Sequence, residues 1–143
     1  MKPIWIVDDD ESIRWVLEKA LARENLSTRS FSNVRDAVAA LDSGTPQVLV
    51  SDIRMPGESG LELLQIVKER FPGKKAKVIT SFSMFYDLED PVDFMKNIHE
   101  VLADDGVWVF EQSYLPTMIE TNSFDTVCHE HLEFYCLKQI QFM

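Results

Sequence analysis

The stretch that decides the fold is Ile4-Trp5-Ile6-Val7, which runs directly into Asp8-Asp9-Asp10. A short apolar run that stops abruptly at carboxylates is typical of a buried parallel strand whose carboxyl end opens on a polar crevice. The run Val48-Leu49-Val50 ends in the same way, in Ser51-Asp52. Ligands lie at the carboxyl ends of the strands in open α/β sheets. We therefore expect Asp8, Asp9 and Asp52 to converge at one edge of the sheet.

Carboxylates that lie within a few ångströms of one another repel. Such a cluster usually holds a hard cation or raises a carboxyl pKa. The alternative is that Asp9 to Glu11 only cap and charge the start of the following helix. Both interpretations stand for the triplet alone, and the addition of Asp52 favours a site.

The rest of the chain alternates between strand and helix patterns with short connections. Apolar residues at helical spacing predict helices over 12–24, 34–41, 60–70 and 90–102. Apolar runs predict further strands over 26–31, 48–52, 77–82 and 107–110. Two less regular helical segments are expected within 114–122 and 132–143. This alternation predicts an α/β fold with a doubly wound parallel sheet of five strands, covered by helices on both faces in three layers.

Composition narrows the class of protein. The length of 143 residues suits a single domain over 1–143. A net charge of −10 argues against binding of nucleic acid or of an anionic membrane by this chain. Neither a span of roughly 20 apolar residues nor a signal peptide is visible, and Cys128 and Cys136 make no disulfide framework. We expect a cytoplasmic protein.

Residues 1 to about 75 resemble the receiver domain of bacterial response regulators, particularly the nitrogen-regulation type. The strings that carry this resemblance are Ile4-Trp5-Ile6-Val7-Asp8-Asp9-Asp10, Ser12-Ile13-Arg14-Trp15-Val16-Leu17-Glu18 and Leu49-Val50-Ser51-Asp52-Ile53-Arg54-Met55-Pro56-Gly57. The resemblance implies that Asp52 accepts a phosphoryl group from a histidine kinase. It also implies that Asp8 and Asp9 hold Mg²⁺ together with Asp52 and the backbone carbonyl of Arg54. The implied strand order is flavodoxin-like, 2-1-3-4-5.

Residues 78–143 are similar instead to an S-adenosylmethionine-dependent methyltransferase of the sugar C-methyltransferase branch. The strings that carry this similarity lie at 79–91, 101–112 and 123–135. It places Glu130 and His131 in a catalytic region, although Cys128 stands where that branch often has tyrosine.

Each resemblance has a missing part. The first turn, Asp8 to Glu11, has no glycine, and its carboxylates would repel the cofactor, so we expect no S-adenosylmethionine binding. Thr80 matches the hydroxyl residue that receivers carry after their fourth strand. Glu111 falls on or near the position of the receiver lysine, which replaces a phosphate-pairing cation with an anion.

Two features of the last third of the chain suggest further sites. Cys128, His129, His131 and Cys136 invite a zinc interpretation, but their spacing contains no Cys-x-x-Cys pair, which disfavours it. An apolar set in the tail could drive a homodimer through its exposure; its members are Leu132, Phe134, Tyr135, Ile140 and Phe142.

We interpret the chain as an engineered chimera of a receiver half, 1–75, and a methyltransferase half, 78–143. On this interpretation it is not an enzyme, Asp52, Thr80, Glu130 and His131 are vestigial, and the acidic pocket binds Mg²⁺ weakly. The first alternative is a working phosphoacceptor receiver domain that partners a histidine kinase in two-component signal transduction. The second is a residual methyltransferase.

Overall fold

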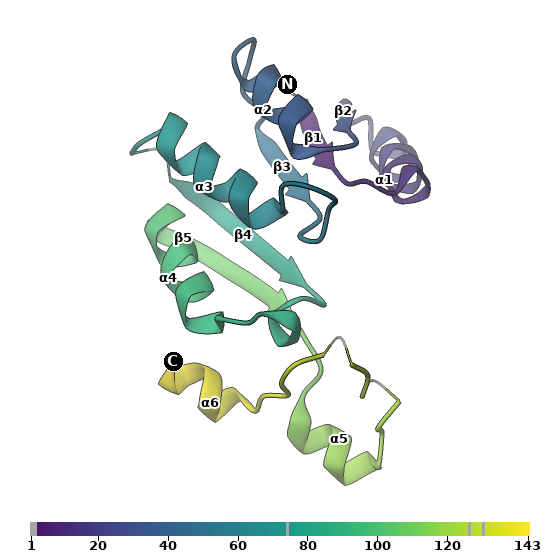
Figure 1. Ribbon diagram of the computed structural model, residues 1–143, viewed down its shortest axis with the longest axis vertical. Helices are drawn as coiled ribbons and strands as arrows, with labels where there is room; N and C mark the ends of the chain where they lie inside the picture. Colours follow the sequence, from purple (N-terminus) through teal and green to yellow (C-terminus); the bar gives the residue numbers. More distant parts are fainter. Residues whose placement is uncertain (1–2, 74, 126, 130) are drawn as a thin grey trace. The chain divides into compact units, whose positions relative to one another are not determined.

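The computed structural model describes residues 3–73, 75–125, 127–129 and 131–143. They form two compact units, Met1–Pro72 and Gly73–Met143, and each is described by itself (Figure 1). The boundary falls close to the predicted junction between 75 and 78. That 1–143 is a single domain stays a prediction.

The first unit is a parallel three-stranded sheet with three helices. In chain order its elements are β1 (Ile4–Val7), α1 (Glu11–Arg23), β2 (Thr28–Phe31), α2 (Val34–Leu41), β3 (Val48–Ser51) and α3 (Gly60–Arg70). The strand order is β2-β1-β3, with Val7 aligned with Phe31 on one side and with Ser51 on the other. This confirms the 2-1-3 part of the predicted order.

The core of this unit follows from the alternation of side chains along β1. Trp5 and Val7 face one side of the sheet, where they pack with α2 and with Leu63 of α3. Ile6 points to the opposite face and is also buried. Figure 1 shows α2 and α3 together on one side of β1 and α1 on the other.

Helix α1 is present as predicted, but no residue of it is buried. Ile13 and Val16, two of the apolar residues whose helical spacing predicts this helix, are 47% and 53% exposed. The spacing of apolar residues shows which of them share a helix face, but a face is buried only where another element packs against it. Within the first unit α1 packs mainly against β1 and β2.

The described residues of the second unit form two parallel strands, a short 3-10 turn and three helices. Its elements are β4 (Ala76–Phe82), η1 (Phe85–Asp87), α4 (Pro91–Val101), β5 (Leu102–Glu111), α5 (Leu115–Thr121) and α6 (Leu137–Phe142). β4 pairs with β5, which confirms their predicted adjacency. β5 begins five residues before the predicted 107, because the chain pairs at Leu102 and then bulges before Val107 resumes the ladder opposite Val78. Gly106 lies in this bulge, where a Cβ would stand 2.8 Å from Leu102 Cδ1.

An aromatic core holds the second unit together. Phe85 is fully buried and its ring lies 5.5 Å from that of Tyr135 and 5.9 Å from that of Trp108. The tail reaches this core because Leu132 N and Glu133 N both donate to the carbonyl of Tyr86. The opposite face of β4 and β5 is exposed and apolar; it carries Val78, Phe82, Val107 and Val109.

The expected apolar patch of the tail is therefore only partly present. Tyr135 and Ile140 are buried in the core, whereas Leu132 and Phe142 are exposed. Residues 132–136 are not helical: Tyr135 makes an isolated bridge with Tyr114, and α6 begins only at Leu137. A homodimer through the tail stays a prediction.

Candidate functional site

The first unit brings the carboxyl ends of β1 and β3 together. Asp52 N donates to Val7 O at 2.8 Å, and Asp8 N donates to Phe31 O at 3.1 Å. Both aspartates thus continue directly from paired strand ends. The structure places Asp8 and Asp52 at one edge of the sheet, as the sequence predicts.

Asp8 is the half-buried carboxylate of this edge. Its Oδ1 accepts from Asp10 N at 2.8 Å. Burial raises the pKa of Asp8, and the negative charges of Asp52, Asp9 and Asp10 raise it further, against the lowering effect of the Asp10 hydrogen bond. The raised pKa of Asp8 thus comes mainly from burial, and repulsion by the neighbouring carboxylates adds to it.

Asp10 has a different role from its neighbours. It is the N-cap of α1, and its Oδ1 accepts from Ser12 N at 2.7 Å and from Ile13 N at 3.3 Å. These hydrogen bonds lower the pKa of Asp10. The capping interpretation of the acidic triplet is therefore right for Asp10, while Asp8 and the exposed Asp9 remain available to a site.

Asp52 is exposed and is held by its own loop. Its Oδ1 accepts from Ile53 N at 2.8 Å, and its backbone oxygen accepts from Ser51 Oγ at 2.8 Å. Gly60 N donates to Ile53 O at 3.0 Å, which brings the start of α3 onto this loop. A Cβ on Gly60 would lie only 2.1 Å from Asp52 O. Gly60 therefore supports the position of Asp52, a role that the sequence reasoning did not find because nothing in a single sequence marks a backbone contact.

A carboxylate set of this kind suits Mg²⁺, which prefers oxygen ligands, keeps several waters and is usually bound through one or two carboxylates. Among the described residues no three histidine, cysteine, aspartate or glutamate side chains gather closely enough to surround an ion. Asp8 and Asp52 each commit one oxygen to a backbone N–H and present a second one. The donors thus fit a weakly held Mg²⁺ rather than a fully preformed cage. The predicted ligation by the carbonyl of Arg54 is not tested by this geometry.

The second unit contains Thr80 and Glu111. Thr80 is an exposed residue of β4, paired with Val109 of β5. Glu111 ends β5, and its Oε2 accepts from Ser83 Oγ at 2.9 Å. Ser83 adopts a left-handed conformation with φ 51° to make the turn after β4.

The predicted zinc and catalytic residues of the tail are dispersed. In the part of the chain that the structure describes, Cys128, His129, His131 and Cys136 do not form a metal-binding group. The ring of His131 packs 4.3 Å from that of Tyr86, and its Nδ1 is buried. Glu130 lies outside the described residues.

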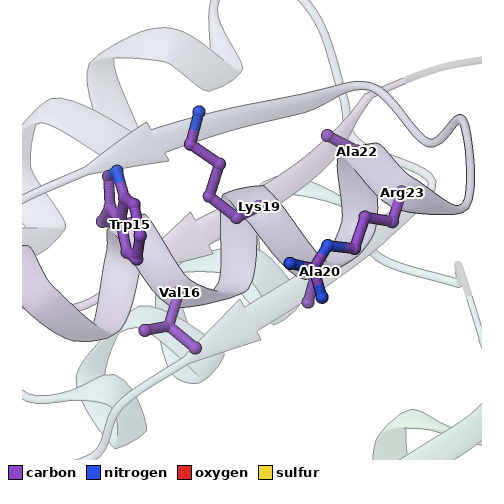
Figure 2. A pocket seen from close by; sticks show the side chains of 6 residues that line it. All are labelled: Trp15, Val16, Lys19, Ala20, Ala22 and Arg23. Carbon is purple, nitrogen blue, oxygen red and sulfur yellow. The ribbon is translucent and has the colours of Figure 1, made fainter.

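Each unit has a shallow depression among its described residues. One follows the exposed side of α1, and Figure 2 shows the six side chains that line it: Trp15, Val16, Lys19, Ala20, Ala22 and Arg23. The other follows α5 between Ser113 and Asp125. Neither contains the predicted site residues. Among the described residues, no helix has the length and apolar character that crossing a membrane requires.

Comparisons with protein families and with curated proteins both point to response regulators. The model of the response regulator receiver domain matches residues 4–97, which extends beyond the predicted limit near 75. The DNA-binding transcriptional regulator NtrC of Salmonella typhimurium is 52% identical over 131 residues, 83% of this chain and 28% of that protein. The NtrC of Proteus hauseri is 50% identical over 80 residues, 56% of this chain and 17% of that protein. The chain therefore spans less than a third of these relatives.

Solved structures confirm the flavodoxin-like α/β fold. The beryllofluoride-activated receiver domain of nitrogen regulatory protein C is 35% identical, with a TM-score of 0.55 over 85% of this chain and 92% of that one. The response regulator TrrA of Thermotoga maritima, solved with Mg²⁺ and beryllofluoride, is 21% identical and supports the fold alone, with a TM-score of 0.56 over 89% of this chain and 100% of that one. These relatives are response regulators, and the methyltransferase origin of 78–143 stays a prediction.

Proposed function

This chain belongs to the response regulator receiver domain family, and from that premise we propose that it is a phosphoacceptor domain of two-component signalling with Asp52 as the accepting residue. The observation that carries the proposal is the convergence of Asp52 with Asp8 at the ends of paired strands. A histidine kinase is the proposed phosphodonor. The chain would accept a phosphoryl group and would not turn over a substrate of its own.

The proposed chemistry is an in-line transfer. An oxygen of the Asp52 carboxylate forms a bond to phosphorus while the bond from phosphorus to the donor breaks, and the donor leaves with that electron pair. Bound Mg²⁺ would supply positive charge to the phosphoryl oxygens and to the crowded carboxylates. Asp8 and Asp9 would hold that ion, with the Arg54 carbonyl as a further ligand, while the hydrogen bond from Ile53 N orients the Asp52 carboxylate.

Labelling by a small phosphodonor tests the proposal. The full chain is incubated with acetyl phosphate with and without Mg²⁺, and covalent addition is followed by intact-mass spectrometry. We expect one phosphoryl group per chain, dependent on Mg²⁺ and absent in Asp52→Asn. Asp125→Asn serves as a matched control, because it makes the same exchange at an exposed aspartate of the second unit and keeps the acceptor and its loop.

Glu111 supports a second candidate. The receiver resemblance places a lysine at or near this position, and an acid there would leave the acyl phosphate without a paired cation. The chain would then be an inactive receiver-derived protein, an engineered chimera in the first interpretation. A folded wild type that binds Mg²⁺ but takes no label would favour this candidate over the phosphoacceptor.

A further inference from the structure

The backbone of Asp8 is fixed from two sides. Its N–H donates to the carbonyl of Phe31 at the end of β2 at 3.1 Å. Its carbonyl accepts from Nη1 of Arg14 at 2.6 Å. The second hydrogen bond involves a charged donor, which makes it one of the stronger kinds in proteins.

Arg14 is joined to the same turn by its own backbone. Its N–H donates to Asp10 O at 3.1 Å, as the first intrahelical hydrogen bond of α1. Arg14 thus hydrogen-bonds to the backbone on both sides of Asp9: its guanidinium donates to the Asp8 carbonyl and its main-chain N–H donates to the Asp10 carbonyl. Because the side chain spans this turn, it restricts the directions in which the Asp8 and Asp9 carboxylates can point.

From this arrangement we infer that Arg14 is a positioning residue for the Mg²⁺ site: it holds the turn from β1 to α1 so that Asp8 and Asp9 face the Asp52 edge. The inference rests on the proposed function, since it concerns the metal site of the proposed phosphoacceptor. Arg14 contacts neither Mg²⁺ nor the reacting atoms in this scheme. It acts through the backbone of Asp8, in the way that residues behind a metal site orient its ligands.

The positive charge of Arg14 predicts the opposite effect on Mg²⁺ affinity, so the experiment can distinguish the two roles. The Arg14 cation lies at the turn that carries Asp8 and Asp10 and repels Mg²⁺, so its removal would strengthen binding if charge alone mattered. If positioning dominates, removal weakens binding, because the freed carboxylates must be ordered when the ion arrives. The sign of the change separates the two.

The experiment measures Mg²⁺ affinity of the full chain by isothermal titration calorimetry, without a phosphodonor, for wild type, Arg14→Met and Arg14→Lys. Arg23→Met is the matched control, because it removes the same charge at the far end of the same helix, about 13 Å along its axis. We expect Arg14→Met to lower the affinity about tenfold. Arg14→Lys should recover most of it through a new hydrogen bond to the Asp8 carbonyl, and Arg23→Met should match wild type.

A second readout separates positioning from general support of the fold. A purely structural role lowers the melting temperature equally with and without Mg²⁺, whereas positioning also shrinks the increase that Mg²⁺ produces. Unchanged or tighter Mg²⁺ binding in Arg14→Met would overturn the inference, and so would an equal loss in Arg23→Met. If Arg14→Met does not fold, Arg14→Gln takes its place with the same expectation. Absence of label on wild-type Asp52 would defeat the proposed function alone, because this titration uses no phosphodonor.

Discussion

Replacing Gly60 with alanine should displace the backbone that carries Asp52. The added Cβ would stand 2.1 Å from Asp52 O and 3.0 Å from Ser51 Oγ. Ordinary van der Waals contact begins near 3.4 Å, so the start of α3 and the Asp52 loop must separate by about 1.3 Å. The nearest atoms are main-chain atoms of a strand end, which cannot rotate away as a side chain can.

Two magnitudes follow from this displacement. Forcing an extra methyl group into a closely packed place costs about 1 to 3 kcal/mol of unfolding free energy. Alanine recovers up to about 1 kcal/mol of helix propensity, so the net loss of unfolding free energy should be at most about 2 kcal/mol when that recovery is complete. A reacting group misplaced by about 1 Å can lose about 100-fold in rate. We therefore expect labelling of Asp52 to fall more steeply than stability does.

The assay combines urea unfolding with the time course of acetyl phosphate labelling in Mg²⁺. Gly44→Ala is the control, since a Cβ there meets nothing within 4 Å, and it should be neutral or slightly stabilising. Wild-type labelling and stability in Gly60→Ala would refute the argument from this close approach. An equal loss in Gly44→Ala would show that the effect is not specific to the Asp52 loop.

Three further predictions concern charge, capping and packing. Because the pKa of Asp8 is raised in the folded protein, the free energy of unfolding without Mg²⁺ should rise as the pH falls through that pKa. Asp8→Asn should therefore be more stable than wild type at neutral pH, by at most about 0.5 kcal/mol, and this gain should vanish in acid. Urea titrations at several pH values measure both. Ser59→Ala removes the capping box that Ser59 shares with Glu62 and should cost about 1 kcal/mol in urea unfolding, whereas equal stability would contradict the cap. Phe85→Ala should cost about 3 to 5 kcal/mol of unfolding free energy, since its ring contacts four other aromatic rings. Phe142→Ala should cost almost nothing in the same urea unfolding experiment, because Phe142 is 93% exposed.

The acidic edge could be predicted because it depends on local pattern. An apolar run that stops at a carboxylate indicates a strand end, and parallel strands bring such ends to the same side. Asp8 and Asp52 therefore lie where the sequence places them. Arg14 and Gly60 could not be found in this way, because one acts through a backbone carbonyl and the other through the side chain that it lacks.

In the second unit the sequence pattern did not predict where β5 begins or that Tyr135 is buried. The spacing of apolar residues placed α4 correctly, but it gave no sign that β5 begins at Leu102 and bulges before Val107. A bulge is an adjustment to the partner strand, so a single strand carries little signal for it. Likewise, Tyr135 was predicted to be exposed and is buried, because its partners lie about 40 to 50 residues earlier in the chain.

Tyr135 and Ile140 belong to the core of the second unit but are the last of its residues that the ribosome adds, so this core cannot be completed until they have been made. At about 5 to 20 residues per second, the ribosome needs about 2 to 8 s to extend the chain from Ile98 to Ile140. Apolar collapse takes well under a millisecond, so Phe85, Phe94 and Ile98 must pass those seconds beside an unfilled core. The first unit has all of its core residues by Phe71 and is free of this delay. During translation the second unit therefore keeps apolar side chains exposed for longer than the half that bears Asp52.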